Sequence, residues 1–142
     1  MDRQQRTQIF ANALKLFTSD SAVAVKELAA LDILPAKLEF GPDGYVVFTD
    51  SSDPTVYTQV ASIQGQPLHW EVSSEPAGVA LTPVQQRALR RYGFALSTQG
   101  DKNPSQPWPR ERVDELPGWI ERVFCDVFGL KENYAPLLVG GI

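Results

Sequence analysis

His69 is the single histidine of the chain and the residue best suited to acid–base chemistry near neutral pH. It lies in segment 68–73, where apolar and polar residues alternate. Alternation places His69 and Glu71 on one face of a β-strand, where a carboxylate can orient an imidazole. Because no nucleophile or set of oxyanion donors accompanies the pair, we interpret both residues as solvated side chains on a wet sheet face.

Cys125 is the second candidate for chemistry. As the only cysteine, it excludes an internal disulfide and any thiolate metal cage. It falls inside a strongly apolar helical pattern, one residue off the central stripe, where a thiol behaves as a small hydrophobe. We therefore favour a packing role for Cys125 over a reactive one.

The remaining residues predict neither a metal site nor a cofactor. The glycines of segment 41–44 and at the C-terminus lack the spacing of a phosphate-binding loop. Five acidic residues are candidate metal ligands, but they are scattered and show no calcium-loop pattern: Asp50, Asp53, Asp114, Glu115 and Asp126.

Composition narrows the function classes further. The chain has 142 residues, 43% hydrophobic and 21% charged, which predicts one folded domain over 1–142. A net charge of −4, with a single basic cluster at Arg87, Arg90 and Arg91, argues against nucleic-acid binding. The polar N-terminal start and the lack of a long apolar run predict a cytoplasmic protein without a membrane segment.

Three groups of elements are expected to build the domain. Apolar residues at helical spacing predict N-terminal helices within 4–31, although Val23 and Val25 leave a strand possible in the second. Turn residues divide 36–74 into four strands, at 37–40, 45–48, 56–63 and 68–73, and the first two are expected to form a hairpin.

Two C-terminal helices follow the sheet. Thr82, Pro83 and Gln85 form a helix-start pattern that predicts a helix over 82–92, ended by Gly93. A broad apolar stripe predicts the last helix over 114–128, with Asp114 as its cap and Pro117 in its first turn. The proline-rich segment 97–109 is expected to be a loop.

These elements predict an α+β fold in which helices cover one face of an antiparallel four-stranded meander. Trp70 is expected in the core because of its place in a clean alternation. The other face is then free for a partner, and Tyr57 and Gln59 lie on it. Trp108 and Trp119 are each either packing residues or contact anchors.

The order of these segments resembles the bacterial TY-Chap family, whose domains are similar to type III secretion chaperones and to YbjN. The resemblance covers about residues 40 to 129, and it ends with Trp108 and the helix to Phe128 and Gly129. Its most specific part is the strand 68–73 followed by the helix 81–89 and the residues Tyr92, Gly93 and Phe94. The loop 97–109 departs from the family pattern, because it is longer and holds one tryptophan where a pair is common. The family implies a secretion-chaperone-like fold, a homodimer and a chaperone or adaptor role without catalysis.

Three functions follow, in order of preference. The first is a non-catalytic, chaperone-like or adaptor module that binds a segment of a partner protein. The second is an immunity or regulatory protein that neutralises one toxin or enzyme. The third is a small enzyme that uses His69 and Glu71.

Overall fold

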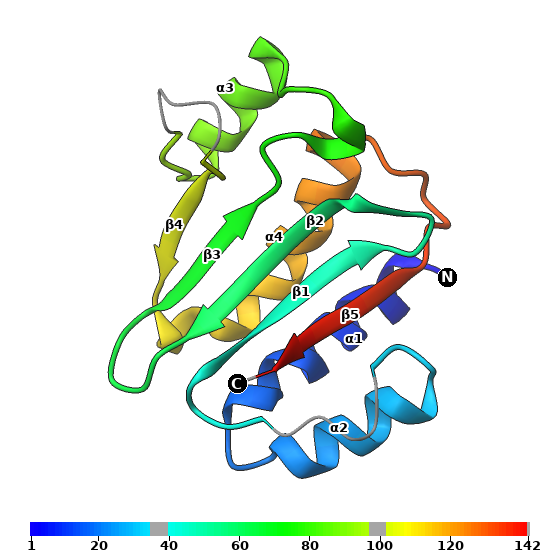
Figure 1. Cartoon of the computed structure of the whole chain (residues 1–142), viewed down its shortest axis with the longest axis vertical. Coiled ribbons are helices and arrows are strands. Elements are labelled where there is room, and N and C mark those ends of the chain that lie inside the picture. The colour runs from blue at the N-terminus through cyan, green and yellow to red at the C-terminus, as the bar shows by residue number, and fades with distance from the viewer. Residues whose placement is uncertain (35–39, 97–101, 142) are drawn as a thin grey trace.

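The computed structural model of the chain describes residues 1–34, 40–96 and 102–141. Within these residues five strands form one antiparallel sheet, in the order β4-β3-β2-β1-β5 (Figure 1). The expected α+β class is confirmed, but the predicted number of four strands is wrong. The strands are β1 Gly44–Asp50, β2 Asp53–Ser62, β3 Leu68–Val72, β4 Ser105–Trp108 and β5 Pro136–Gly141.

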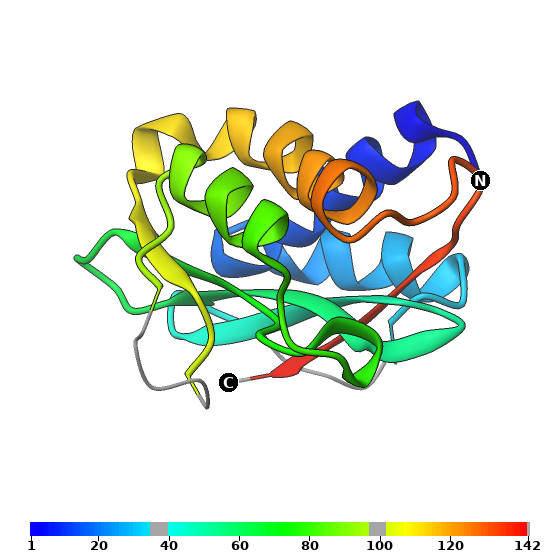
Figure 2. The ribbon, with the colours of Figure 1, turned by 90° about the horizontal axis from the view of Figure 1, so that it is seen from above.

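The helices lie together on one side of this sheet (Figure 2). In Figure 2 no α-helix of the described residues crosses the other side, as the one-sided alternation of the strands predicts. The α-helices are α1 Arg3–Leu14, α2 Ser21–Ala30, α3 Pro83–Arg91 and α4 Leu116–Arg122. Shorter helical turns are η1 Lys15–Phe17, η2 Pro76–Gly78, η3 Arg110–Glu115 and the π-helical η4 Val123–Val127, which continues α4.

Local sequence explains where α3 begins and ends. The side chain of Thr82 accepts a hydrogen bond from the Gln85 backbone N–H, and the Gln85 side chain accepts one from the Thr82 N–H. Pro83 stands at the first helical position, where its missing N–H costs nothing. Gly93, at φ 98°, ends the helix in a conformation that favours glycine. The predicted start pattern is confirmed.

Of two further helix predictions, the second N-terminal helix is confirmed and the last helix needs adjustment. Segment 21–30 is helical rather than extended, and its valines did not produce a strand. The last helix starts later than predicted, because Asp114 belongs to the 3-10 turn η3 and gives no side-chain cap. Pro117 does lie in the first turn of α4.

Strand β4 corrects the expectation of a loop over 97–109. Residues 97–101 lie outside the described part of the chain, but 105–108 pair with β3 from Leu68↔Trp108 to Glu71↔Ser105. Pro107 pairs with His69 although it cannot donate a backbone hydrogen bond. Proline is tolerated in a strand at the edge of a sheet, and β4 is the last strand on its side.

Strand β5 supplies the second correction. The predicted strand 37–40 falls outside the described residues except for Phe40, which is not in a strand. Strand β1 instead lies between β2 and the C-terminal β5, with Tyr45 opposite Gly141 and Asp50 opposite Pro136. A Cβ atom at Gly140 would collide with the Tyr45 carbonyl oxygen, so glycine is what lets the two backbones approach.

The core fills the space between the helices and the inner face of the sheet. Trp70 is fully buried, as predicted, and its ring packs against Phe94 and Trp108 at centroid distances of 4.5 and 5.6 Å. Its Nε1–H donates to the Thr58 hydroxyl, which leaves this buried polar group satisfied. The helix layer and one sheet face therefore share one apolar interior.

Candidate partner-binding surface

We call the helix-free side of the sheet the outer face, and its composition follows from the strand register. One row of neighbouring side chains runs across all five strands through Val139, Val47, Gln59, Glu71 and Ser105. The parallel rows contain the remaining members of the face: Tyr45, Ala61, His69 and Pro107 on one side, and Leu137, Thr49 and Tyr57 on the other.

The outer face is almost free of charge. Glu71 is the only one of these residues with a carboxylate, and none carries an ammonium or guanidinium group. Protein surfaces that stay in water are usually rich in charged side chains, whereas the centres of protein interfaces are depleted in them. The composition of this face is therefore that of a contact surface.

Apolar groups gather where β5 lies beside β1. Val139 is 56% exposed, Leu137 is 40% exposed and Tyr45 is 39% exposed, although Leu138 between the first two is buried. Sequence analysis did not single these residues out. The available signal was the short apolar run Leu137-Leu138-Val139, which is compatible with a strand but does not show which side chains face water.

Tyr57 and Gln59 occupy the middle strand of the outer face, as predicted, and both are half-buried. The hydroxyl of Tyr57 accepts a hydrogen bond of 2.8 Å from Nδ2 of Asn103. The Oδ1 atom of Asn103 accepts one from the Ser74 backbone N–H. These bonds hold the side chain of Tyr57 in place on the sheet.

The two tryptophans differ from each other. Trp108 is buried and its indole N–H donates to the Arg112 carbonyl, so its side chain packs inside and is not a contact anchor. Trp119 is half-buried on α4, against the ring of Tyr92 at 5.3 Å and beneath the guanidinium of Arg122. Trp119 therefore lies on the helix side of the molecule and away from the outer face.

His69 and Glu71 share the outer face, as alternation predicted. Within the described residues, however, no hydrogen bond or ion pair joins the two side chains. His69 is exposed and stands between Ala61 and Pro107, which offer no group for proton transfer. The geometry that would orient the imidazole for acid–base work is thus not formed.

A buried ionic cluster lies on the opposite, helical side of the molecule. Arg6 of α1 and Glu121 of α4 are both buried, and Nε of Arg6 is 2.9 Å from Oε1 of Glu121. Tyr134 donates its hydroxyl to the same carboxylate at 2.8 Å. The Nη1 group of Arg6 donates hydrogen bonds to the backbone carbonyls of Glu132 and Tyr134. The cluster joins both ends of the chain to α4.

The contacts of this cluster determine its protonation. Burial opposes ionisation of Glu121, but hydrogen bonds from Arg6, Tyr134 and Cys125 outweigh it and hold the pKa of this carboxyl below its usual value. Burial and the Glu121 charge raise the pKa of the Tyr134 hydroxyl. The cluster therefore holds a neutral tyrosine and an ion pair at neutral pH.

Cys125 belongs to the edge of the same cluster. Its Sγ lies 3.3 Å from Oε1 of Glu121 and can donate to it. Burial, then the hydrogen bond to Glu121, raise the pKa of the thiol to about 11. Because the thiolate is the nucleophilic form, this environment keeps Cys125 unreactive at neutral pH.

The described residues contain no group of three or more His, Cys, Asp or Glu side chains placed to hold a metal ion. Across 1–34, 40–96 and 102–141, every helix is too short or too polar to cross a bilayer. Comparison with models of known families, with curated proteins and with solved structures found no match to this chain. The resemblance to the TY-Chap family therefore stays a prediction.

Proposed function

We propose that the chain is a non-catalytic module that binds a segment of a partner protein on the outer face, in a chaperone-like or adaptor role. The observation that carries the proposal is a helix-free sheet face with one carboxylate and three well-exposed apolar side chains, Tyr45, Leu137 and Val139. Covering such a face removes apolar surface from water at little cost in charge desolvation.

The middle of the face suits a polypeptide better than a small molecule. The amide of Gln59 offers both a donor and acceptors, and it stands between Val47 and Glu71. The ring of Tyr57, held through its hydroxyl by Asn103, provides a rigid aromatic contact with little rotamer entropy left to lose. A flat face of this kind matches the extended surface of another protein.

The arrangement of the ionisable groups favours binding over catalysis. His69 has no orienting partner among the described residues, and the thiol of Cys125 is held in its neutral form. The predicted resemblance to TY-Chap domains would agree with a chaperone or adaptor role.

Site-specific photo-crosslinking tests the proposal. A benzophenone amino acid placed at Gln59 is expected to capture a partner protein in the cell of origin. The same group at Val23, which is 59% exposed on α2, serves as the control position. Mass spectrometry then identifies the captured chain and the residues that were joined.

The proposal predicts capture of a partner from Gln59 but not from Val23. It also predicts that Val139→Glu weakens the binding of that partner to the chain. Equal capture from both positions would contradict the proposal. So would capture of a second copy of this chain alone, because the face would then serve self-association.

A further inference from the structure

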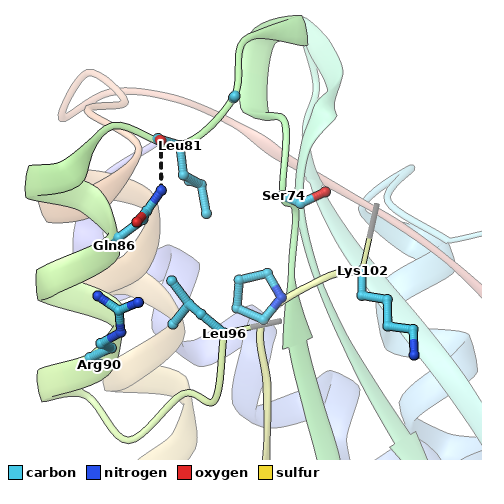
Figure 3. A pocket seen from close by; sticks show the side chains of 8 residues that line it. Ser74, Leu81, Gln86, Arg90, Leu96 and Lys102 are labelled. Carbon is cyan, nitrogen blue, oxygen red and sulfur yellow. Dashed lines mark hydrogen bonds between the residues drawn. The ribbon is translucent and has the colours of Figure 1, made fainter. Parts of the chain in front are cut away.

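A concave site lies along α3, away from the outer face. It is a half-open hollow of about 130 Å³ between α3 and the ends of β3 and β4. Figure 3 shows the side chains of Leu81 and Leu96 directed into this space. Ala80 and the buried Pro104 complete its apolar lining. We call it the α3 notch.

Cationic side chains flank the α3 notch. In Figure 3 Arg90 lies on one side of Leu96 and Lys102 on the other, with the ammonium end of Lys102 directed away from the hollow. Both residues line the notch. Arg87 and Arg91 extend the positive charge along the exposed surface of α3. Helix α3 contains no acidic residue, although the whole chain carries a net charge of −4.

Helix stability explains only part of this charge. Arg90 and Arg91 stand in the last turn of α3, where cations interact favourably with the helix dipole. Arg87 lies a turn earlier, and Lys102 belongs to a different segment that lines the other side of the notch. The helix dipole therefore does not account for the positive charge of Arg87 and Lys102.

We propose that the α3 notch binds an acidic peptide segment that places one aliphatic side chain between Leu81 and Leu96. One of its carboxylates then meets Arg90, and a second is met by the exposed side chain of Lys102 once that side chain turns toward the notch. A hollow of about 150 Å³ lined by apolar groups holds a benzene ring, so a volume near 130 Å³ suits a leucine-sized group. This inference goes beyond the outer face, since it concerns a different surface and a different ligand chemistry.

A defined peptide probe tests the proposal with the full chain. Fluorescence anisotropy is measured with a fluorescein-labelled peptide of sequence Gly-Glu-Glu-Leu-Glu-Glu-Gly, and with a second peptide in which serine replaces leucine. The leucine peptide is expected to bind at least tenfold more tightly than the serine peptide. Its affinity should fall when salt rises from about 50 to about 300 mM, because exposed charges are screened.

Charge-matched variants locate the binding. Arg90→Glu combined with Lys102→Glu should weaken the leucine peptide at least tenfold. Lys15→Glu combined with Lys26→Glu makes the same change in net charge on exposed residues elsewhere and should leave affinity unchanged. Ala80→Trp keeps all charges, fills the notch and should also weaken binding. Circular dichroism checks that each variant is folded.

Several results would overturn the proposal. They are absence of binding by the leucine peptide, equal affinity of the two peptides, equal loss in both double variants, or tighter binding of a single-stranded oligonucleotide that displaces the peptide. Val139→Glu on the outer face should leave peptide affinity unchanged. Failure at the notch is therefore distinguishable from failure of the proposed partner site.

Discussion

Two regions of the molecule contrast in where their charged and apolar groups lie. They are the buried cluster of Arg6, Glu121 and Tyr134 and the outer face of the sheet. In the cluster, charges lie out of water and each of their polar atoms has a partner within the described residues. On the outer face, apolar side chains such as Val139 lie in water and carry almost no charge beside them. Within the described residues the polar atoms of the cluster are satisfied, whereas the apolar side chains of the outer face stay exposed.

This contrast distinguishes residues that stabilise the fold from residues that we propose to bind a partner. Buried charge that is fully paired does not by itself indicate a catalytic site, even beside a cysteine and a tyrosine. The hydrogen bonds of the cluster hold α1 and the segment before β5 against α4. The weakly charged outer face, with its exposed apolar side chains, is the surface on which we propose that a partner binds.

The largest expected effect comes from Glu121→Ala. The change leaves the guanidinium of Arg6 buried without its carboxylate, and losing one member of a buried ion pair costs about 3–5 kcal/mol. Urea unfolding followed by circular dichroism measures this loss. A loss below about 1 kcal/mol in the free energy of unfolding would mean that the cluster does not hold these segments together.

Gly140→Ala should have the next largest effect. Its Cβ would collide with the Tyr45 carbonyl oxygen, and β5 must shift to relieve the contact. We expect a loss of about 1–3 kcal/mol in the free energy of unfolding. Gly141→Ala is the matched control, because nothing lies within 4 Å of its added Cβ. Similar losses in both variants would contradict the placement of β5 beside β1.

The cluster also predicts how stability depends on pH. Hydrogen bonds keep the pKa of Glu121 below its unfolded value, so its ionised form adds stability above about pH 4.3. That contribution is lost as pH falls through the folded pKa. In Glu121→Gln the stability profile below about pH 5 should be flatter than in the parent chain. Glu75→Gln, at an exposed position, should keep the parent's slope.

The smallest effect on stability is expected on the outer face. Val139→Glu adds charge to a side chain that is already 56% exposed, so the free energy of unfolding should change by no more than about 0.5 kcal/mol. The same urea titration checks this value. A loss comparable to that of Gly140→Ala would show that Val139 belongs to the core.

Local sequence signals predicted the parts of the fold that depend on local contacts. The capping pattern at Thr82 and Gln85 fixed the start of α3, and alternation placed Trp70 inside and Gln59 outside. Strand β4 was missed because Pro107 indicated a loop, and proline in a strand is acceptable only at an edge. That edge exists only once the sheet is assembled.

Long-range pairing explains the other misses. Strand β5 lies beside β1, with Tyr45 opposite Gly141. This pairing is distant in the sequence, and a local pattern does not show which strand an apolar C-terminal segment will join. Arg6 and Glu121 are 115 residues apart in the chain, and each appears in its own helix as an ordinary charged residue. The outer face was predicted in part, because Tyr57 and Gln59 both lie on β2, where every second residue points to the same face.

The affinity of the partner captured from Gln59, measured for three forms of the chain, tests the central claim most directly. The account predicts that Val139→Glu weakens binding at least tenfold, whereas Val23→Glu, equally exposed on α2, binds like the parent. Equal affinity of all three forms, with each one folded, would contradict a partner-binding role for the outer face.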